Sequence, residues 1–206
     1  MRSFFGVGAH QAESRRSLRC REQGFIRGVL EKMISKGQEQ SFAAASFEAI
    51  FGWMVLEHTE APRETLDEAF RLLTPGGLLA LSVPDFAAWD RRLFGAYWRG
   101  LELPRHLQHF TPATLEAALT RSGFDVERVI HQRSAFNIVC SVGLLLREWR
   151  ATRGLGQRLI DFTDSPSMLG ELALAPLAKV LGVTRQSGRM TVLARKPPAA
   201  TRETAI

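Results

Sequence analysis

The segment GWMVLEH, residues 52–58, places two large side chains, an acid and an imidazole directly after an apolar run. That run, residues 46–51, is typical of a buried strand. A strand that leads into Trp53, Glu57 and His58 suits the rim of a pocket better than the middle of a core. The alternative is that Trp53 is a core aromatic residue and that Glu57 and His58 cap the helix expected next.

A second polar group lies in the segment RHLQHF, residues 105–110. An unperturbed histidine titrates near working pH, so His106 is a candidate general base. The alternative is a structural histidine that bonds a loop carbonyl. His106 and His109 are spaced i, i+3, but no third ligand is evident in the sequence. We therefore do not expect a metal site.

The bulk composition is that of an ordinary globular protein. The chain has 206 residues, of which 45% are hydrophobic and 23% are charged, and its formal net charge is +6. These values predict a single domain over residues 1–197 with a real core, followed by a flexible tail at 198–206. The positive charge indicates either a solvated basic surface or attraction to an anionic partner. No interleaved aromatic and basic motif indicates nucleic acid binding.

Several sequence features concern the cellular compartment and partners. Cys20 and Cys140 stand far apart, which favours neither a disulfide framework nor a zinc site and predicts a cytoplasmic location. The start of the chain lacks a signal-peptide pattern, and no run of 18 apolar residues predicts a membrane span. The apolar segment at about 134–184 also carries arginines. Contact with a membrane surface is therefore an alternative to simple packing of this segment on the core, and the oligomeric state is left open.

Apolar periodicity divides the chain into alternating strands and helices. The expected strands are 3–9, 25–33, 46–53, 78–85, 125–133 and 189–197. The expected helices are 12–24, 62–73 and 111–124, and a helical insert spans about 134–184 before the last strand. This alternation predicts an α/β fold with a mainly parallel sheet and helices on both faces. Ligands of such sheets bind at the carboxyl ends of strands, where residues 52–58 fall.

Two helices have clear boundary signals. Pro62 begins the first, and the TPGG sequence at 74–77 is expected to end it in a reversal. Thr111 is the expected N-cap of the second, with Pro112 at its first helical position and Gly123 past its end.

Three sequence blocks resemble a known family in their order and spacing. They are SFEAIFGWMVLEH, RLLTPGGLLALSVPD and PRHLQHFTPATLEAALTRSGF, and the resemblance covers about residues 24–130. Together they are similar to the class I S-adenosylmethionine-dependent methyltransferases, in particular the small-molecule type. The resemblance implies a Rossmann-like fold, S-adenosylmethionine as cofactor and a small molecule as methyl acceptor.

The resemblance also implies roles for individual residues. Gly52 and Trp53 correspond to the strand end that lines the methionine side of the cofactor pocket. Leu30 and Glu31 stand where adenine is contacted, although Glu31 is equally typical of an ordinary surface loop. In the family the segment corresponding to residues 89–110 helps cover the acceptor, and His106 is the candidate general base within it. Apolar walls are expected from four aromatic residues: Trp89, Phe94, Tyr97 and Trp98.

The front of the family pattern is missing from this sequence. Residues 4–14 align with the second strand of the family and the turn after it, and the ribose-binding acid would fall near Gly8, where no acid occurs. The first strand and its glycine-rich loop would then precede Met1. A rival alignment treats GVGAH, residues 6–10, as a worn glycine loop. We therefore expect an N-terminally truncated domain, a misassigned start or a degenerate relative.

Two principal hypotheses follow from the resemblance and the departure from it. The first is methyl transfer from S-adenosylmethionine to a small molecule, with activity in question because the glycine loop and the ribose-binding acid are absent. The second is a non-catalytic remnant or interaction module with the same fold. A third, an anion or membrane-surface binder, depends only on charge and the apolar insert.

Overall fold

The computed structural model describes residues 26–27, 42–165 and 167–198. The strand expected at 3–9, the helix expected at 12–24, and Leu30 and Glu31 lie outside these ranges. The alignment of residues 4–14, on which the expected loss of the first strand and glycine loop depends, lies outside them too. Those predictions therefore have no structural counterpart here.

The core of the fold is a five-stranded mixed sheet with the order β1-β2-β3-β5-β4. The strands are β1 (Ile26–Arg27), β2 (Phe47–Trp53), β3 (Leu73–Pro84), β4 (Asp125–His131) and β5 (Arg189–Arg195). β1, β2 and β3 run parallel, whereas β5 runs antiparallel to both of its neighbours. The predicted Rossmann-like α/β architecture is confirmed, and only the last strand departs from the parallel direction.

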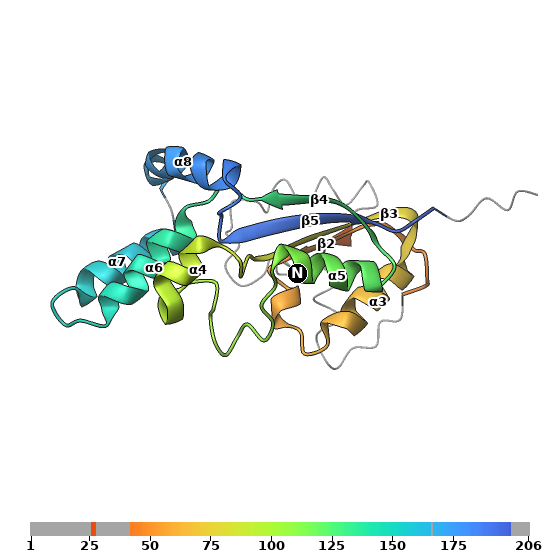
Figure 1. Cartoon of the computed structure of the whole chain (residues 1–206), viewed down its shortest axis with the longest axis horizontal. Coiled ribbons are helices and arrows are strands. Elements are labelled where there is room, and N and C mark those ends of the chain that lie inside the picture. The colour runs from red at the N-terminus through yellow and green to blue at the C-terminus, as the bar shows by residue number, and fades with distance from the viewer. Residues whose placement is uncertain (1–25, 28–41, 166, 199–206) are drawn as a thin grey trace, which may run out of the picture.

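The reversed direction of β5 follows from the chain path. Between β4 and β5 the chain forms three helices, α6 (Phe136–Arg147), α7 (Arg153–Asp164) and α8 (Met168–Val183). These helices gather at the end of the sheet where β4 finishes (Figure 1). β5 must therefore start at that end and run back through the sheet, which makes it antiparallel to β3 and β4.

Two helices cover one face of the sheet. α3 (Pro62–Leu72) and α5 (Pro112–Arg121) lie side by side on it, while α8 lies on the other side, beside β4 (Figure 1). Alternate residues of the central strands face α3 and α5, as the two-residue period of a strand requires. The resulting core includes Leu66 and Ala69 of α3, Leu115 and Leu119 of α5, Leu79, Leu81 and Val83 of β3, and Met190, Val192 and Ala194 of β5.

The boundaries of α5 follow the predicted signals. The hydroxyl of Thr111 accepts a hydrogen bond from the backbone N–H of Thr114, and the Thr114 hydroxyl in turn accepts one from the backbone N–H of Thr111. Gly123 follows the helix with a φ of 89°. A side chain is disfavoured there by the left-handed backbone, and a Cβ would also lie 3.0 Å from the ring of Phe70.

The turn expected after α3 is absent. β3 begins at Leu73, directly after α3, because Leu73 pairs with Phe47 of β2. The register then shifts between Phe47 and Ala49, and Gly76 adopts a φ of 79°. The glycines therefore produce an irregularity within β3 rather than a separate reversal before it.

Helices α6 and α7 approach each other closely at two glycines. A Cβ on Gly143 would lie 2.8 Å from the carbonyl oxygen of Gly156, and one on Gly156 would lie 2.6 Å from the carbonyl oxygen of Gly143. Within the described ranges, no single helix is both long and apolar enough to cross a membrane. The pair α7 and α8 meets those criteria only together, with a bend of 91° between them.

Candidate functional site

The carboxyl ends of β2 and β3 lie side by side and form one edge of the sheet. The last residue of β2, Trp53, pairs with Ser82 of β3. Met54 then turns the chain with a φ of 53°, and its N–H donates to the Ser82 carbonyl at 2.8 Å. Trp53 is 39% exposed and Gly52 is buried. The alternative of Trp53 as a core aromatic residue is therefore wrong, while its contact with a cofactor remains a prediction.

A short helix follows this edge. The 3-10 helix η3 (Leu56–His58) carries Glu57 and His58, and it ends before α3 begins. The N-cap residue of α3 is Ala61, and no side chain caps that helix. The alternative that Glu57 and His58 cap the helix starting at Pro62 is therefore wrong.

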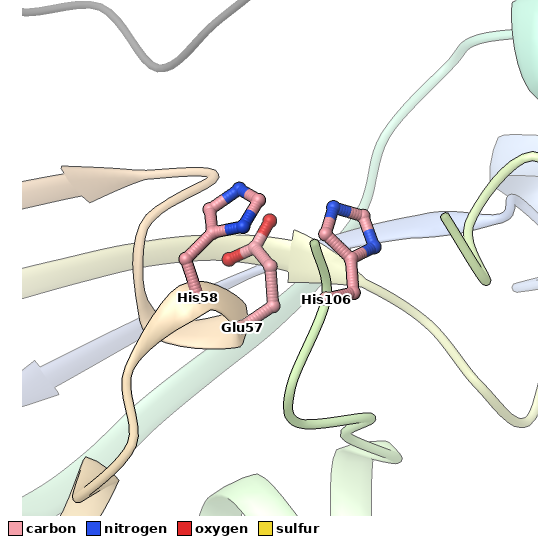
Figure 2. Close-up of side chains that lie close together, drawn as sticks. All are labelled: Glu57, His58 and His106. Atoms are coloured by element: carbon pink, nitrogen blue, oxygen red, sulfur yellow. The ribbon is translucent and has the colours of Figure 1, made fainter. Parts of the chain in front are cut away.

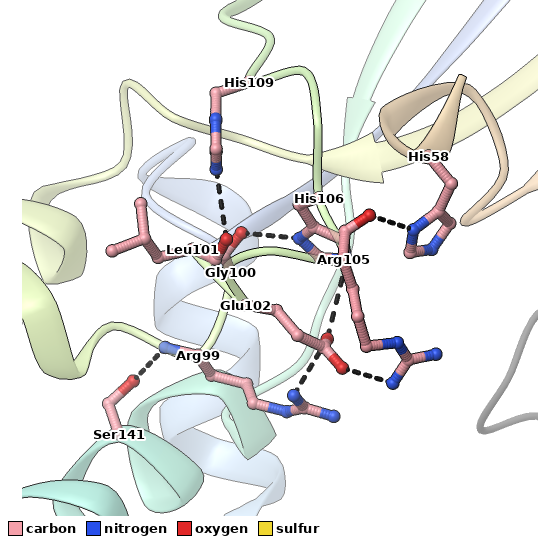
Figure 3. A network of polar contacts seen from close by, with 9 residues as sticks. All are labelled: His58, Arg99, Gly100, Leu101, Glu102, Arg105, His106, His109 and Ser141. Atoms are coloured by element: carbon pink, nitrogen blue, oxygen red, sulfur yellow. Dashed lines mark hydrogen bonds and ion pairs between the residues drawn. The ribbon is translucent and has the colours of Figure 1, made fainter. Parts of the chain in front are cut away.

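The loop at 98–109 folds back onto η3. The backbone N–H groups of Leu107 and Gln108 donate to the carbonyl of Glu57 at 2.8 and 3.0 Å. The Nδ1 atom of His58 donates to the carbonyl of Arg105 at 2.8 Å (Figure 3). These bonds join two segments about fifty residues apart in sequence and fix the position of the loop over the end of β2.

Glu57 is an ionisable group that is fully buried at this edge of the sheet. Its side chain is 0% exposed, and neither carboxyl oxygen has a hydrogen-bond partner among the described residues. Burial raises the pKa of Glu57 to about 7, against the opposing effects of its own backbone N–H and of the positive charge on Arg189. The same burial lowers the pKa of Arg189 below its ordinary value, which the charge of Glu57 counteracts.

His106 is buried within the loop and bonds a backbone carbonyl. Its Nδ1 atom donates to the carbonyl of Gly100 at 2.9 Å (Figure 3). Its Nε2 atom lies 3.5 Å from Oε2 of Glu102, and desolvation lowers the pKa of the imidazole. The structural contact foreseen as the alternative is present. A neutral ring with Nδ1 protonated also leaves a lone pair on Nε2, so the general-base role stays a prediction.

Glu102 organises the charged side of the loop. Its carboxylate accepts from Arg105 at 2.7 Å and from Arg99 at 2.8 Å (Figure 3). The backbone N–H of Arg99 donates to the hydroxyl of Ser141 in α6 at 2.9 Å. The loop is therefore attached both to η3 and to the helices that follow β4.

The structure brings three candidate ligand groups together at this edge. Glu57, His58 and His106 each offer one nitrogen or oxygen atom, and these atoms all lie within 4.8 Å of one another. Figure 2 shows the three side chains close together, and the centroids of the two imidazole rings are 4.8 Å apart. Sequence reasoning identified all three residues but did not place His106 against the other two.

A second buried acidic group, which sequence reasoning missed, follows β3. One oxygen of Asp85 accepts from the backbone N–H of Ala87 at 2.9 Å, and the other lies 3.5 Å from Nδ1 of His131. Asp90 lies nearby, also buried. Burial raises the pKa of both aspartates. The available signal was Asp85 itself, an acid directly after the buried strand β3.

The four aromatic residues expected to form apolar walls do not share one environment. Trp89, in α4 (Trp89–Phe94), is 39% exposed, and Phe94 and Tyr97 are partly exposed. Trp98 is instead 1% exposed and lies so close to Gly100 that a Cβ on this glycine would clash with the indole ring. Trp98 therefore belongs to the interior of the loop and not to an exposed wall.

One comparison with known proteins identifies a family for this chain. A family model described as a methyltransferase domain matches residues 10–129, more than half of the chain. No curated protein matches the sequence at a significant level.

Solved structures also resemble the chain at low sequence identity. A SAM-dependent methyltransferase from Thermotoga maritima is 13% identical with a TM-score of 0.48, and the match covers 89% of this chain and 70% of that one. An S-adenosylmethionine-dependent methyltransferase from Mesorhizobium loti is 18% identical with a TM-score of 0.43, with coverage of 88% and 76%. The cyclase SpnF is 19% identical with a TM-score of 0.43, and the match covers 78% of this chain. The chain spans 54% of the length of the cyclase and 58% of two further structures.

Proposed function

Because the chain belongs to the methyltransferase-domain family whose model matches residues 10–129, we propose that it transfers a methyl group from S-adenosylmethionine to a small-molecule acceptor. The family match is the observation that carries this proposal. The position of Trp53, Glu57 and His106 at the carboxyl ends of parallel strands agrees with it, because ligands of open α/β sheets bind at that edge.

The residues at the end of β2 fit the cofactor. When bound, S-adenosylmethionine supplies an electrophilic methyl group on a positively charged sulfonium. The exposed ring of Trp53 can attract such a cation through its face, and the buried carboxyl of Glu57 adds negative charge at the same edge once it ionises above its pKa of about 7. Gly52 and Trp53 would therefore hold the methionine side. Leu30 and Glu31 would contact adenine, as the family resemblance implies.

On the acceptor side, His106 would act as general base. The Gly100 carbonyl holds the proton on Nδ1, so Nε2 is the atom that would accept a proton from the acceptor. Desolvation lowers the pKa of the imidazole, which favours the neutral ring that a base requires. The loop that carries His106 is fixed to η3 through Glu57 and His58, so the base would be positioned before the acceptor binds.

Equilibrium dialysis with radiolabelled S-adenosylmethionine tests the proposal with two matched variants. Trp53→Ala removes the aromatic face at the end of β2, whereas Trp149→Ala removes a tryptophan that is 65% exposed in the turn after α6. We expect Trp53→Ala to weaken binding about tenfold, which corresponds to the loss of about 1.4 kcal/mol of cation–π attraction. Trp149→Ala should bind like the parent chain. Equal affinities for all three proteins would contradict the assignment of Trp53.

A second candidate function is contact with an anionic membrane surface, favoured by α8. Five apolar side chains at helical spacing are between 57% and 83% exposed along this helix: Met168, Leu169, Leu172, Val180 and Val183. Arg147, Arg150, Arg153 and Arg158 lie on or between the neighbouring helices α6 and α7. Flotation with vesicles containing anionic lipid at low salt tests this candidate. The candidate would be contradicted if the parent chain stays in the bulk fraction. It would also be contradicted if the Leu172→Glu variant floats as well as the parent.

A further inference from the structure

Glu57, His58 and His106 form a cluster of three groups that could each bind a metal ion, and the proposed methyl transfer does not require this clustering. One atom from each side chain lies within 4.8 Å of the other two (Figure 2). Four-coordinate zinc places neighbouring ligand atoms about 3.3 Å apart, given bond lengths of about 2.0–2.2 Å. Side-chain adjustments of about 1 Å would therefore bring the three groups to bonding distance of one ion.

The carboxylate of this cluster receives no hydrogen bond from another residue in the described ranges, apart from the effect of its own backbone N–H. Glu57 is 0% exposed, and neither of its oxygens has a partner in the described ranges. An unpaired buried carboxylate is costly, so it is expected to take up a proton or a cation. Arg189 acts on it electrostatically but donates no hydrogen bond to it. The remaining negative charge therefore faces the two imidazoles.

Each of the two imidazoles has its Nδ1 atom bonded to a backbone carbonyl. A carbonyl oxygen only accepts hydrogen bonds, so Nδ1 carries the proton in His58, which donates to Arg105, and in His106, which donates to Gly100. This tautomer leaves Nε2 of each ring with its lone pair. Backbone carbonyls on the second ring nitrogen are the common outer partners of ligating histidines, where they orient the ring.

The charges around the cluster indicate that the type of ligand atoms, and not the net charge, would determine which metal ion binds. Glu102 lies 3.5 Å from His106, while Arg99 and Arg105 bind that carboxylate and Arg189 acts on Glu57. The three arginines exceed the two carboxylates by one positive charge, so a hard cation such as Mg²⁺, which prefers oxygen ligands, gains little here. Two imidazoles and one carboxylate instead suit divalent ions of the later first-row metals and zinc.

We propose that Glu57, His58 and His106 form a binding site for a divalent transition-metal ion of the Zn²⁺ or Co²⁺ type. A bound ion would join η3 to the loop at 98–109 and leave one coordination position open. It would also occupy the lone pair on Nε2 of His106, which a general base needs. Metal binding would therefore stabilise the fold at this edge and inhibit base catalysis by the same histidine.

Cobalt titration of the full chain, freed of metal with a chelator, tests the site without any cofactor or acceptor. We expect one Co²⁺ per chain, with the visible absorption of a tetrahedral nitrogen and oxygen site, and a Zn²⁺-dependent rise of several degrees in the unfolding midpoint. Glu57→Gln and His106→Gln should each weaken binding at least about tenfold. His109→Gln, on the same loop, should bind like the parent because the His109 ring bonds the carbonyl of Leu101.

Three results would overturn the proposal: no tetrahedral absorption, unchanged binding by Glu57→Gln, or an equal loss of binding in His109→Gln. Circular dichroism identifies any variant that fails to fold. If Glu57→Gln is one of these, His58→Gln provides the decisive comparison, because that side chain is partly exposed. Failure to bind S-adenosylmethionine would contradict the proposed function and leave the metal result unaffected.

Discussion

The buried carboxyl of Glu57 predicts a pH dependence of stability. Its pKa rises from 4.5 to about 7 on folding because the side chain is removed from water. At 1.36 kcal/mol per pH unit, this rise corresponds to about 3 kcal/mol. Glu57→Gln removes the ionisation while it keeps the size of the side chain, so the variant should lack this dependence.

The sign of the effect follows from which state holds the proton. Below pH 4.5 both folded and unfolded Glu57 are protonated, so the carboxyl contributes no difference. Between pH 4.5 and about 7 the folded chain retains a proton that the unfolded chain releases, and stability falls as the pH rises. Above pH 7 the whole penalty is present. The free energy of unfolding of the parent, relative to Glu57→Gln, should therefore drop by about 3 kcal/mol between pH 4.5 and pH 8.

Urea unfolding of both proteins at several pH values, in the presence of a chelator, measures this difference. The effects of the Arg189 and Glu102 charges on Glu57 are already included in its pKa of about 7, and the other titrating groups are common to both proteins. Glu116→Gln, at an exposed position of α5, is the matched control and should run parallel to the parent. A parent and a Glu57→Gln variant that also run parallel would refute the conclusion that Glu57 is buried without a partner.

Two further predictions concern the helices. Gly156→Ala should destabilise the chain in urea unfolding by about 1–3 kcal/mol, because its Cβ would lie 2.6 Å from the carbonyl oxygen of Gly143. The control Gly154→Ala has no atom within 4 Å of its Cβ and should stabilise the chain by about 0.5–1 kcal/mol. The opposite order would contradict the close contact of α6 and α7. Thr111→Ala should cost about 1 kcal/mol through loss of the N-cap of α5, and an unchanged midpoint would show that the bond to Thr114 contributes nothing.

Local signals in the sequence were sufficient to predict most of the strands and the helices that cover the sheet. The apolar run before Gly52 became β2, and Leu66 and Ala69 of the helix expected at 62–73 face the core. Thr111 and Gly123 mark the two ends of α5 as expected. These features depend on residues close in sequence, so periodicity and capping rules reach them.

The features that sequence reasoning missed depend on long-range contacts. His106 meets Glu57 only because the backbone of the loop bonds the carbonyl of Glu57 across about fifty residues. Trp98 was expected on a pocket wall, but the absence of a side chain on Gly100 lets the indole turn inward. The early start of β3 likewise follows from pairing between Leu73 and Phe47. No local pattern encodes such contacts.

Calorimetric titration of the chain with S-adenosylmethionine tests the central proposal most directly. The proposed function predicts saturable heat with one site per chain, reduced in Trp53→Ala and abolished by prior saturation with S-adenosylhomocysteine, the demethylated product. Titration at high micromolar cofactor that yields only the heat of dilution would contradict it. The chain would then keep the methyltransferase fold without the cofactor chemistry of that family.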